Sequence, residues 1–190
     1  MSFTMTDLQN IVNIAGQALM EEDAYLAGCL ARRKPRPYTG DHPPGMLWRT
    51  REVFYQFLTY RKLLLCFPKL VDVERDSLFD FVIYSETGAL EAVGEMKRWM
   101  TTTGEPEVPL IQKDIDKIIR RNLPGFVLIV SANPPGTTHS NLVELARLLG
   151  QHEDRFATPF RFPSAGVAGE CEMFVAGIFV EATVVAHPTQ

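Results

Sequence analysis

Apolar residues recur at helical spacing near the start of the chain. They lie in the segment 7–33, where they fall on one face of an α-helix with Thr6 as its expected N-cap. The face is formed by Leu8, Ile11, Ile14, Ala18 and Leu19. Residues 33–46 hold four prolines and two glycines, a composition typical of a loop. We therefore predict an N-terminal helical segment and Pro-rich linker over residues 1–46.

A second helix is predicted over residues 47–67, because Pro68 would end it. A broad arc of this helix is expected to be buried; it comprises Val53, Phe54, Phe57, Tyr60, Arg61 and Leu64. Glu52 lies at the margin of the arc, so its carboxylate is expected to lie along the edge of a core and not to point straight into water.

The pattern then changes from helical spacing to alternation. Residues 69–76 and 77–85 read as two strands, 86–88 as a turn, and 89–99 as a third strand. Asp80 lies inside the second of these strands. Short turns between consecutive strands predict an antiparallel meander.

The remaining elements complete an α/β architecture. A helix over 109–122 has Ile111, Ile115, Ile118 and Ile119 on its expected inner face. A fully apolar strand, a further helix, a Phe- and Pro-rich stretch and a last strand follow, at 126–132, 141–150, 156–170 and 171–186. Residues 47–190 are thus predicted to form an α/β sandwich with a mixed central sheet flanked by helices, extended by a C-terminal strand.

Composition limits the class of protein. The chain of 190 residues is 46% apolar and 22% charged, as expected for one compact domain, and no apolar run approaches the roughly 18 residues that span a bilayer. We expect a cytoplasmic protein that does not enter a membrane. Its net charge of −4 argues against binding of nucleic acid through a general positive field, so a nuclease would need a focused positive groove, a partner or a homodimer to supply cationic surface. The three scattered cysteines are expected to be reduced core thiols.

Candidate chemistry lies in the meander. A carboxylate in the middle of a strand is costly to bury without a partner, so Asp80 needs one. Glu95 and Lys97 follow 15 and 17 residues later and share one face of the next strand. If the strands pair, two carboxylates and an ammonium converge, and carboxylates are ligands for hard divalent cations such as Mg²⁺. The alternative to a metal site is a cross-strand ion pair between Asp80 and Lys97 with no catalytic role.

Asp80 followed by Glu95-Met96-Lys97 resembles the D…(D/E)xK signature of the PD-(D/E)XK nuclease superfamily, which includes many restriction endonucleases. The order of elements over residues 47–150 is similar as well. The resemblance implies a restriction endonuclease-like fold in which Asp80, Glu95 and the carbonyl of Met96 bind Mg²⁺ or Mn²⁺ and Lys97 acts on the attacking water. Two further residues resemble site positions of the superfamily, Glu52 on the first core helix and Gln112 on the helix after the motif.

The sequence also departs from the superfamily pattern. Phe79 stands where the pattern has Pro, and Gln112 is followed by Asp116 where the RecB-like pattern has Tyr. The expected function is nevertheless metal-dependent hydrolysis of phosphodiester bonds in nucleic acid, with DNA as the preferred substrate. The alternative is a non-catalytic protein of the same fold that binds nucleic acid or protein in a bacterial defence or effector system.

Other residues have simpler expected roles. Three basic residues of the helix 109–122 are expected on a solvated outer face: Lys113, Lys117 and Arg120. Arg98 is positioned to meet a phosphate, whereas Trp99 suits either a base or the core. The basic residues at 32, 33, 34 and 36 suit a solvated linker. No spacing of histidine or serine supports zinc or serine hydrolase chemistry, and no segment fits a phosphate-binding P-loop.

Overall fold

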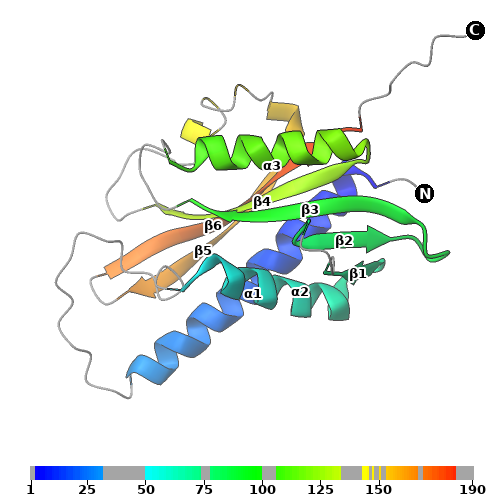
Figure 1. Cartoon of the computed structure of the whole chain (residues 1–190). Coiled ribbons are helices and arrows are strands. Elements are labelled where there is room, and N and C mark those ends of the chain that lie inside the picture. Colours follow the sequence, from blue (N-terminus) through cyan, green and yellow to red (C-terminus); the bar gives the residue numbers. More distant parts are fainter. Residues whose placement is uncertain are drawn as a thin grey trace, which may run out of the picture.

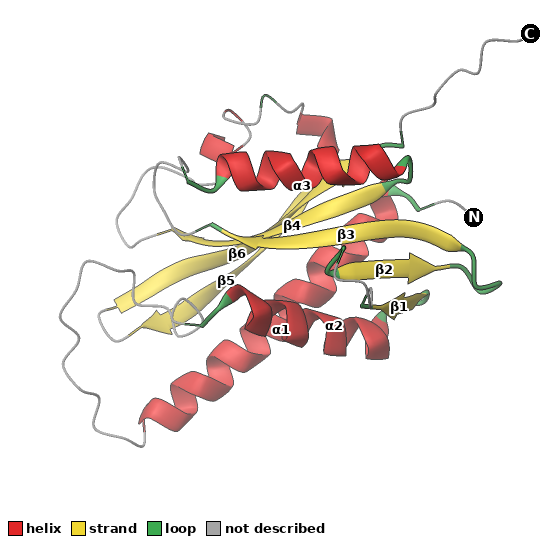
Figure 2. Ribbon diagram, in the orientation of Figure 1, coloured by secondary structure: helices red, strands yellow, loops and turns green. Residues whose placement is uncertain are grey.

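In the computed structural model, a six-stranded sheet carries helices on both faces (Figures 1 and 2). The structure describes residues 3–31, 50–73, 78–99, 106–133, 143–145, 147, 150, 153–166 and 169–182. The strands are β1 Leu70–Asp72, β2 Phe81–Tyr84, β3 Leu90–Arg98, β4 Gly125–Asn133, β5 Phe156–Gly166 and β6 Gly169–Val180. Their order in the sheet is β1-β2-β3-β4-β6-β5, and the β3–β4 pair is parallel while its neighbours are antiparallel.

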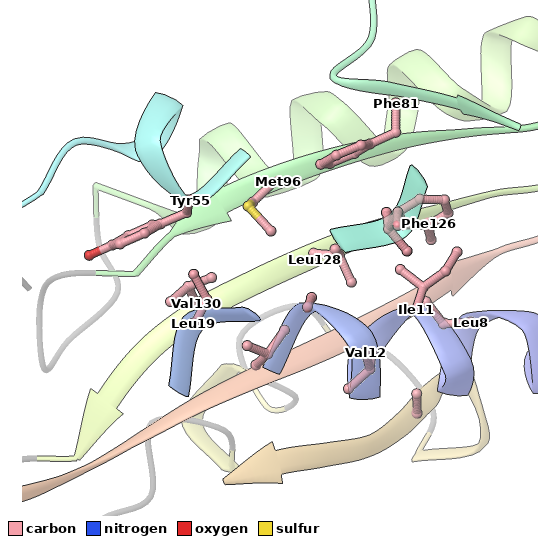
Figure 3. Close-up of a cluster of buried hydrophobic side chains, with 14 of the residues drawn as sticks. Leu8, Ile11, Val12, Leu19, Tyr55, Phe81, Met96, Phe126, Leu128 and Val130 are labelled. Carbon is pink, nitrogen blue, oxygen red and sulfur yellow. The ribbon is translucent and has the colours of Figure 1, made fainter. Parts of the chain in front are cut away.

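Two hydrophobic cores lie on opposite faces of this sheet. Helices α1 (Met5–Ala31) and α2 (Glu52–Cys66) cover one face, and helix α3 (Val108–Arg121) covers the other. Figure 3 shows the larger core, where α1 and α2 meet Met96 of β3 and Phe126 and Leu128 of β4. A short 3-10 helix, η2 (Glu153–Arg155), precedes β5. The predicted α/β sandwich with a mixed sheet is confirmed, as is the meander β1-β2-β3.

Helix α1 begins earlier than predicted. Thr4, and not Thr6, precedes the helix, and its hydroxyl accepts a hydrogen bond from the Asp7 amide at 3.3 Å. The Asp7 carboxylate in turn accepts from the Thr4 amide at 2.9 Å, so the two residues cap the helix reciprocally. Gln9 then exchanges two hydrogen bonds with the backbone of Thr158, which docks α1 on β5. The predicted linker 33–46 lies outside the described residues.

The expected buried face of α2 is wrong in part: Phe54 and Tyr60 are partly buried against the core, but three apolar residues of the arc are exposed. Its buried residues are Tyr55, Leu58, Thr59 and Leu63. By contrast Val53, Phe57 and Leu64 are 65%, 55% and 49% exposed. Apolar side chains lie around most of this helix, so their spacing alone could not show which face meets the sheet.

Helix α3 follows its predicted pattern with one exchange. Ile111, Ile115 and Ile118 are buried as expected, whereas Ile119 is 38% exposed. Asp114 takes its place on the inner face and is 8% exposed. The helix ends at Asn122, whose left-handed backbone (φ 53°) closes the last turn through its amide and the Ile119 carbonyl.

The C-terminal third differs from prediction in its strands. Much of the Phe- and Pro-rich stretch forms β5, which pairs with β6 at the edge of the described sheet, and an edge strand is where Pro is tolerated. The helix expected at 141–150 is described only in part, with residues 143–145 and 147 helical. Cys171 is buried, but Cys29 and Cys66 are exposed, so the expectation of core thiols holds for Cys171 alone. Among the described helices, none combines the length and apolar character needed to cross a membrane.

Candidate functional site

Strand β3 extends beyond the end of its neighbour β2. The last pair between them joins Phe81 with Gly94, while β3 stays paired with β4 as far as Arg98 and Val130. Asp80 therefore lies directly before β2 and not inside it, which corrects the predicted strand bounds. Beyond Gly94, one edge of β3 meets no strand of the described chain.

Two carboxylates take the place of the missing strand. Asp80 Oδ2 accepts a hydrogen bond from the Met96 amide at 2.8 Å, and Glu52 Oε2 accepts one from the Arg98 amide at 3.0 Å. The Trp99 amide points the other way, to the Val130 carbonyl on β4, as expected from strand alternation. Because the amide and carbonyl of one strand residue point to the same side, the Met96 carbonyl also faces this edge. Asp80, Glu52 and the Met96 backbone thus meet where β2 ends.

Glu95 and Lys97 project from β3 towards α3, on the same face as the buried Val93 and Trp99. Glu95 is only 3% exposed, and its Oε1 forms a short ion pair with Lys117 Nζ. Lys117 Nζ also lies 4.5 Å from the centroid of the Phe79 ring. Its predicted position on a solvated outer face is therefore wrong, because the side chain folds back from α3 to the strand.

Lys97 lies between two carboxylates from different helices. Its Nζ is 3.4 Å from Glu52 Oε1 on α2 and 3.2 Å from Asp114 Oδ2 on α3. No cross-strand ion pair of Lys97 with Asp80 is found among the described contacts. Lys97 therefore bridges the helices on the two faces of the sheet across the free edge of β3.

The surroundings shift the pKa values of Glu95 and Lys97 in ways that matter for chemistry. Burial raises the pKa of Glu95 to about 8, the nearby Asp80 and Asp114 add to the rise, and Lys117 opposes it. For Lys97, burial favours the neutral amine, but the charges of Glu52 and Asp114 outweigh it and raise the pKa above its ordinary value. Lys97 is thus an ammonium at neutral pH.

Glu95 makes stability depend on pH. Because its pKa rises from 4.5 unfolded to about 8 folded, its contribution is fully present below pH 4.5 and is lost as pH rises towards 8. We expect wild-type protein to lose about 1–3 kcal/mol relative to Glu95→Gln across this window, less than the full shift implies because Lys117 and water relax around the carboxylate. Urea denaturation of both proteins at each end of the window measures this, and parallel pH dependences would contradict it.

Two sequence-predicted residues lie outside the cluster. Gln112 donates a hydrogen bond to Asp116 at 2.9 Å on the exposed side of α3, and no described contact joins it to Glu95 or Lys97. Trp99 is 1% exposed and belongs to the core. Arg98 donates from its guanidinium to the Thr50 carbonyl, which ties β3 to the start of α2.

Sequence reasoning missed Asp114 and Lys117. The signal for Asp114 was present, because it shares the helical face of Ile111, Ile115 and Ile118, where a carboxylate needs a partner. No such signal marked Lys117. Its long side chain starts at the margin of the helix and reaches Glu95 only because α3 lies across β3.

The oxygen donors of the cluster suit a hard divalent cation. Asp80, Glu95 and the Met96 carbonyl supply oxygens only, and Mg²⁺ is commonly held by one or two carboxylates with water completing its shell. A bound cation would also offset the repulsion from Asp80 and Asp114, which adds to the effect of burial in raising the pKa of Glu95. Within the described residues, however, no three His, Cys, Asp or Glu side chains converge as around a metal ion. The fit is therefore to a cation bound by two carboxylates and several waters.

Comparison with protein-family models, curated proteins and solved structures found no match to this chain. The function is consequently inferred from the site itself.

Proposed function

We propose that this protein is a metal-dependent phosphodiesterase that cleaves nucleic acid, with DNA as its preferred substrate. The proposal includes a restriction endonuclease-like fold and a PD-(D/E)XK-type site formed by Asp80, Glu95 and Lys97. The shown α/β sandwich and the resemblance of these residues to the superfamily signature both support it.

One observation supports the proposal above all others: the hydrogen bond from the Met96 amide to Asp80. Met96 is the residue between Glu95 and Lys97, so this bond brings Asp80 to the centre of the three-residue motif. From the sequence alone, the proximity of Asp80 to this motif depended on the pairing of their two strands. The hydrogen bond also gives the Asp80 carboxylate a partner, so an ion pair with Lys97 is not needed to explain its position.

Asp80 and Glu95 would hold Mg²⁺ or Mn²⁺, with the Met96 carbonyl as a further oxygen donor. When bound, the cation supplies Lewis-acid activation of water and neutralises charge on the phosphate. Asp80 and Glu95 each accept one described hydrogen bond, and a carboxylate offers about four acceptor positions, so both could still bind a cation. Lys117 would have to release Glu95.

Lys97 would orient the attacking water and stabilise the negative charge that grows on the phosphate oxygens. Its raised pKa makes it a donor of hydrogen bonds and not a base at neutral pH. Glu52 and Asp114 hold the ammonium from opposite sides, 3.4 Å and 3.2 Å away, and are positioning residues. Among the described residues, Gln112 has no contact that would give it a role in this mechanism.

A second candidate is a non-catalytic nucleic-acid-binding protein of the same fold. The ion pair between Lys117 and Glu95 favours it, because an ammonium already neutralises the carboxylate that a metal would need. The two candidates differ in whether a divalent cation can displace Lys117.

Incubation of the purified protein with labelled single-stranded and duplex DNA and RNA, with Mg²⁺, Mn²⁺ or EDTA, tests the proposal. Cleavage that requires the cation and is lost in Glu95→Ala supports it. Retained cleavage in Glu95→Ala would contradict it, and binding without cleavage under every condition would favour the second candidate.

A further inference from the structure

Helix α2 turns an apolar face away from the core. Val53, Phe57 and Leu64 lie on this face at helical spacing and are each about half exposed or more. The Arg61 guanidinium, one turn after Phe57, lies 5.9 Å from the centroid of its ring. Exposed apolar residues that share one face can mark a surface that binds a ligand or partner.

Val53 and Phe57 of this face line a groove that reaches the candidate site. The groove has a volume of about 460 Å³. Its lining includes Val53, Gln56, Phe57 and Tyr60 of α2, and Phe79 and Asp80 from the opposite side. Asp80 therefore belongs both to the groove and to the candidate site, and Phe79 also contacts Lys117 of that site.

The lining has the chemistry of a site for a flat heterocycle. Phe57 and Tyr60 supply aromatic rings to the lining, and the Tyr60 hydroxyl donates to Asp72 Oδ1 at 3.3 Å, which helps to fix its ring. The Gln56 amide can both donate and accept hydrogen bonds, as the edge of a base requires. The Arg61 guanidinium over the Phe57 ring adds a cation beside the groove.

We propose that this groove binds an unpaired nucleobase next to the phosphate that the site would cleave, so that the substrate is single-stranded or locally unpaired nucleic acid. This inference rests on the proposed function, because only then does a phosphate lie beside Asp80. A base stacked inside a duplex cannot enter a groove walled by Phe57 and Tyr60. Stacking on aromatic rings is tolerant of sequence, so the groove selects strand state and not base identity.

Fluorescence anisotropy with a labelled oligodeoxythymidine in the presence of EDTA tests this binding apart from cleavage. Phe57→Ala is expected to weaken binding about 5- to 150-fold, the loss of one base–aromatic stack. Its binding of a duplex of the same length is expected to stay unchanged. Leu65→Ala is the matched control, because Leu65 lies on the same helix, is 79% exposed and does not line the groove.

Several results would overturn the inference. The first is equal single-strand binding by Phe57→Ala and wild type. The second is equal binding of single strand and duplex by wild type. The third is self-association that depends on Phe57, which would make a second copy of the chain the occupant of the groove. Binding is measured without metal, so Phe57-dependent binding without cleavage would refute the proposed activity alone. Cleavage unaffected by Phe57→Ala, with unchanged single-strand binding, would refute the groove alone.

Discussion

Replacing Lys97 by methionine is expected to slow phosphodiester cleavage by about 10²–10³-fold, the loss of one donor that stabilises charge in the transition state. The ammonium is held between Glu52 and Asp114, where it can meet water or a phosphate oxygen, and methionine keeps the length of the side chain without its charge. The rate is measured with saturating Mg²⁺ on labelled DNA, and the fold is checked by circular dichroism and thermal melting.

Lys113→Met is the matched control for this experiment. Lys113 is exposed on α3, so its loss changes the net charge equally without touching the cluster. Cleavage by Lys97→Met at the wild-type rate would contradict the assigned role. Lys97→Met leaves Glu52 and Asp114 facing each other without a cation. Lys97→Arg is therefore the second variant, because it keeps the charge and displaces the donor atoms.

Replacing Asp80 by asparagine is expected to weaken Mn²⁺ binding by at least about 100-fold. Loss of a group that only supports a ligand typically costs 10–100-fold in metal affinity, and loss of a ligand's charge should cost more. The amide oxygen of asparagine can still accept the hydrogen bond from the Met96 amide, so the end of β2 should stay in place. The substitution therefore separates the charge of Asp80 from its structural role.

Calorimetric titration with Mn²⁺ in the absence of nucleic acid measures this effect. Asp116→Asn is the control, because Asp116 lies on the exposed side of α3 and pairs with Gln112. Equal Mn²⁺ affinity in Asp80→Asn and wild type would show that the cation, if bound, uses other ligands.

The sequence predicted the sheet where local patterns decide structure. Side chains alternate along a strand, and this correctly assigned Glu95 and Lys97 to one face of β3. The strand is buried on both faces, so packing fixes its register. Short turns likewise predicted the antiparallel pairing of β2 with β3. What alternation could not reveal is that β2 stops at Phe81, and this stop creates the edge where Asp80 and Glu52 bind the backbone.

The missed features depend on how distant elements pack. Phe57 was expected in the core because it belongs to an apolar arc, yet Tyr55 and Leu58 face the sheet instead. Lys117 was assigned to solvent because its helix position is polar, yet Glu95 lies within its reach. The sequence of one helix cannot reveal either result, because each depends on where that helix packs against the sheet.

The central claim is that Asp80 and Glu95 bind a divalent cation, and a crystal structure with Mn²⁺ soaked in tests it most directly. We expect an anomalous peak within about 2.0–2.3 Å of oxygens from both carboxylates, with Lys117 moved away from Glu95. A structure at saturating Mn²⁺ with no peak there and with Lys117 still paired to Glu95 would contradict the account.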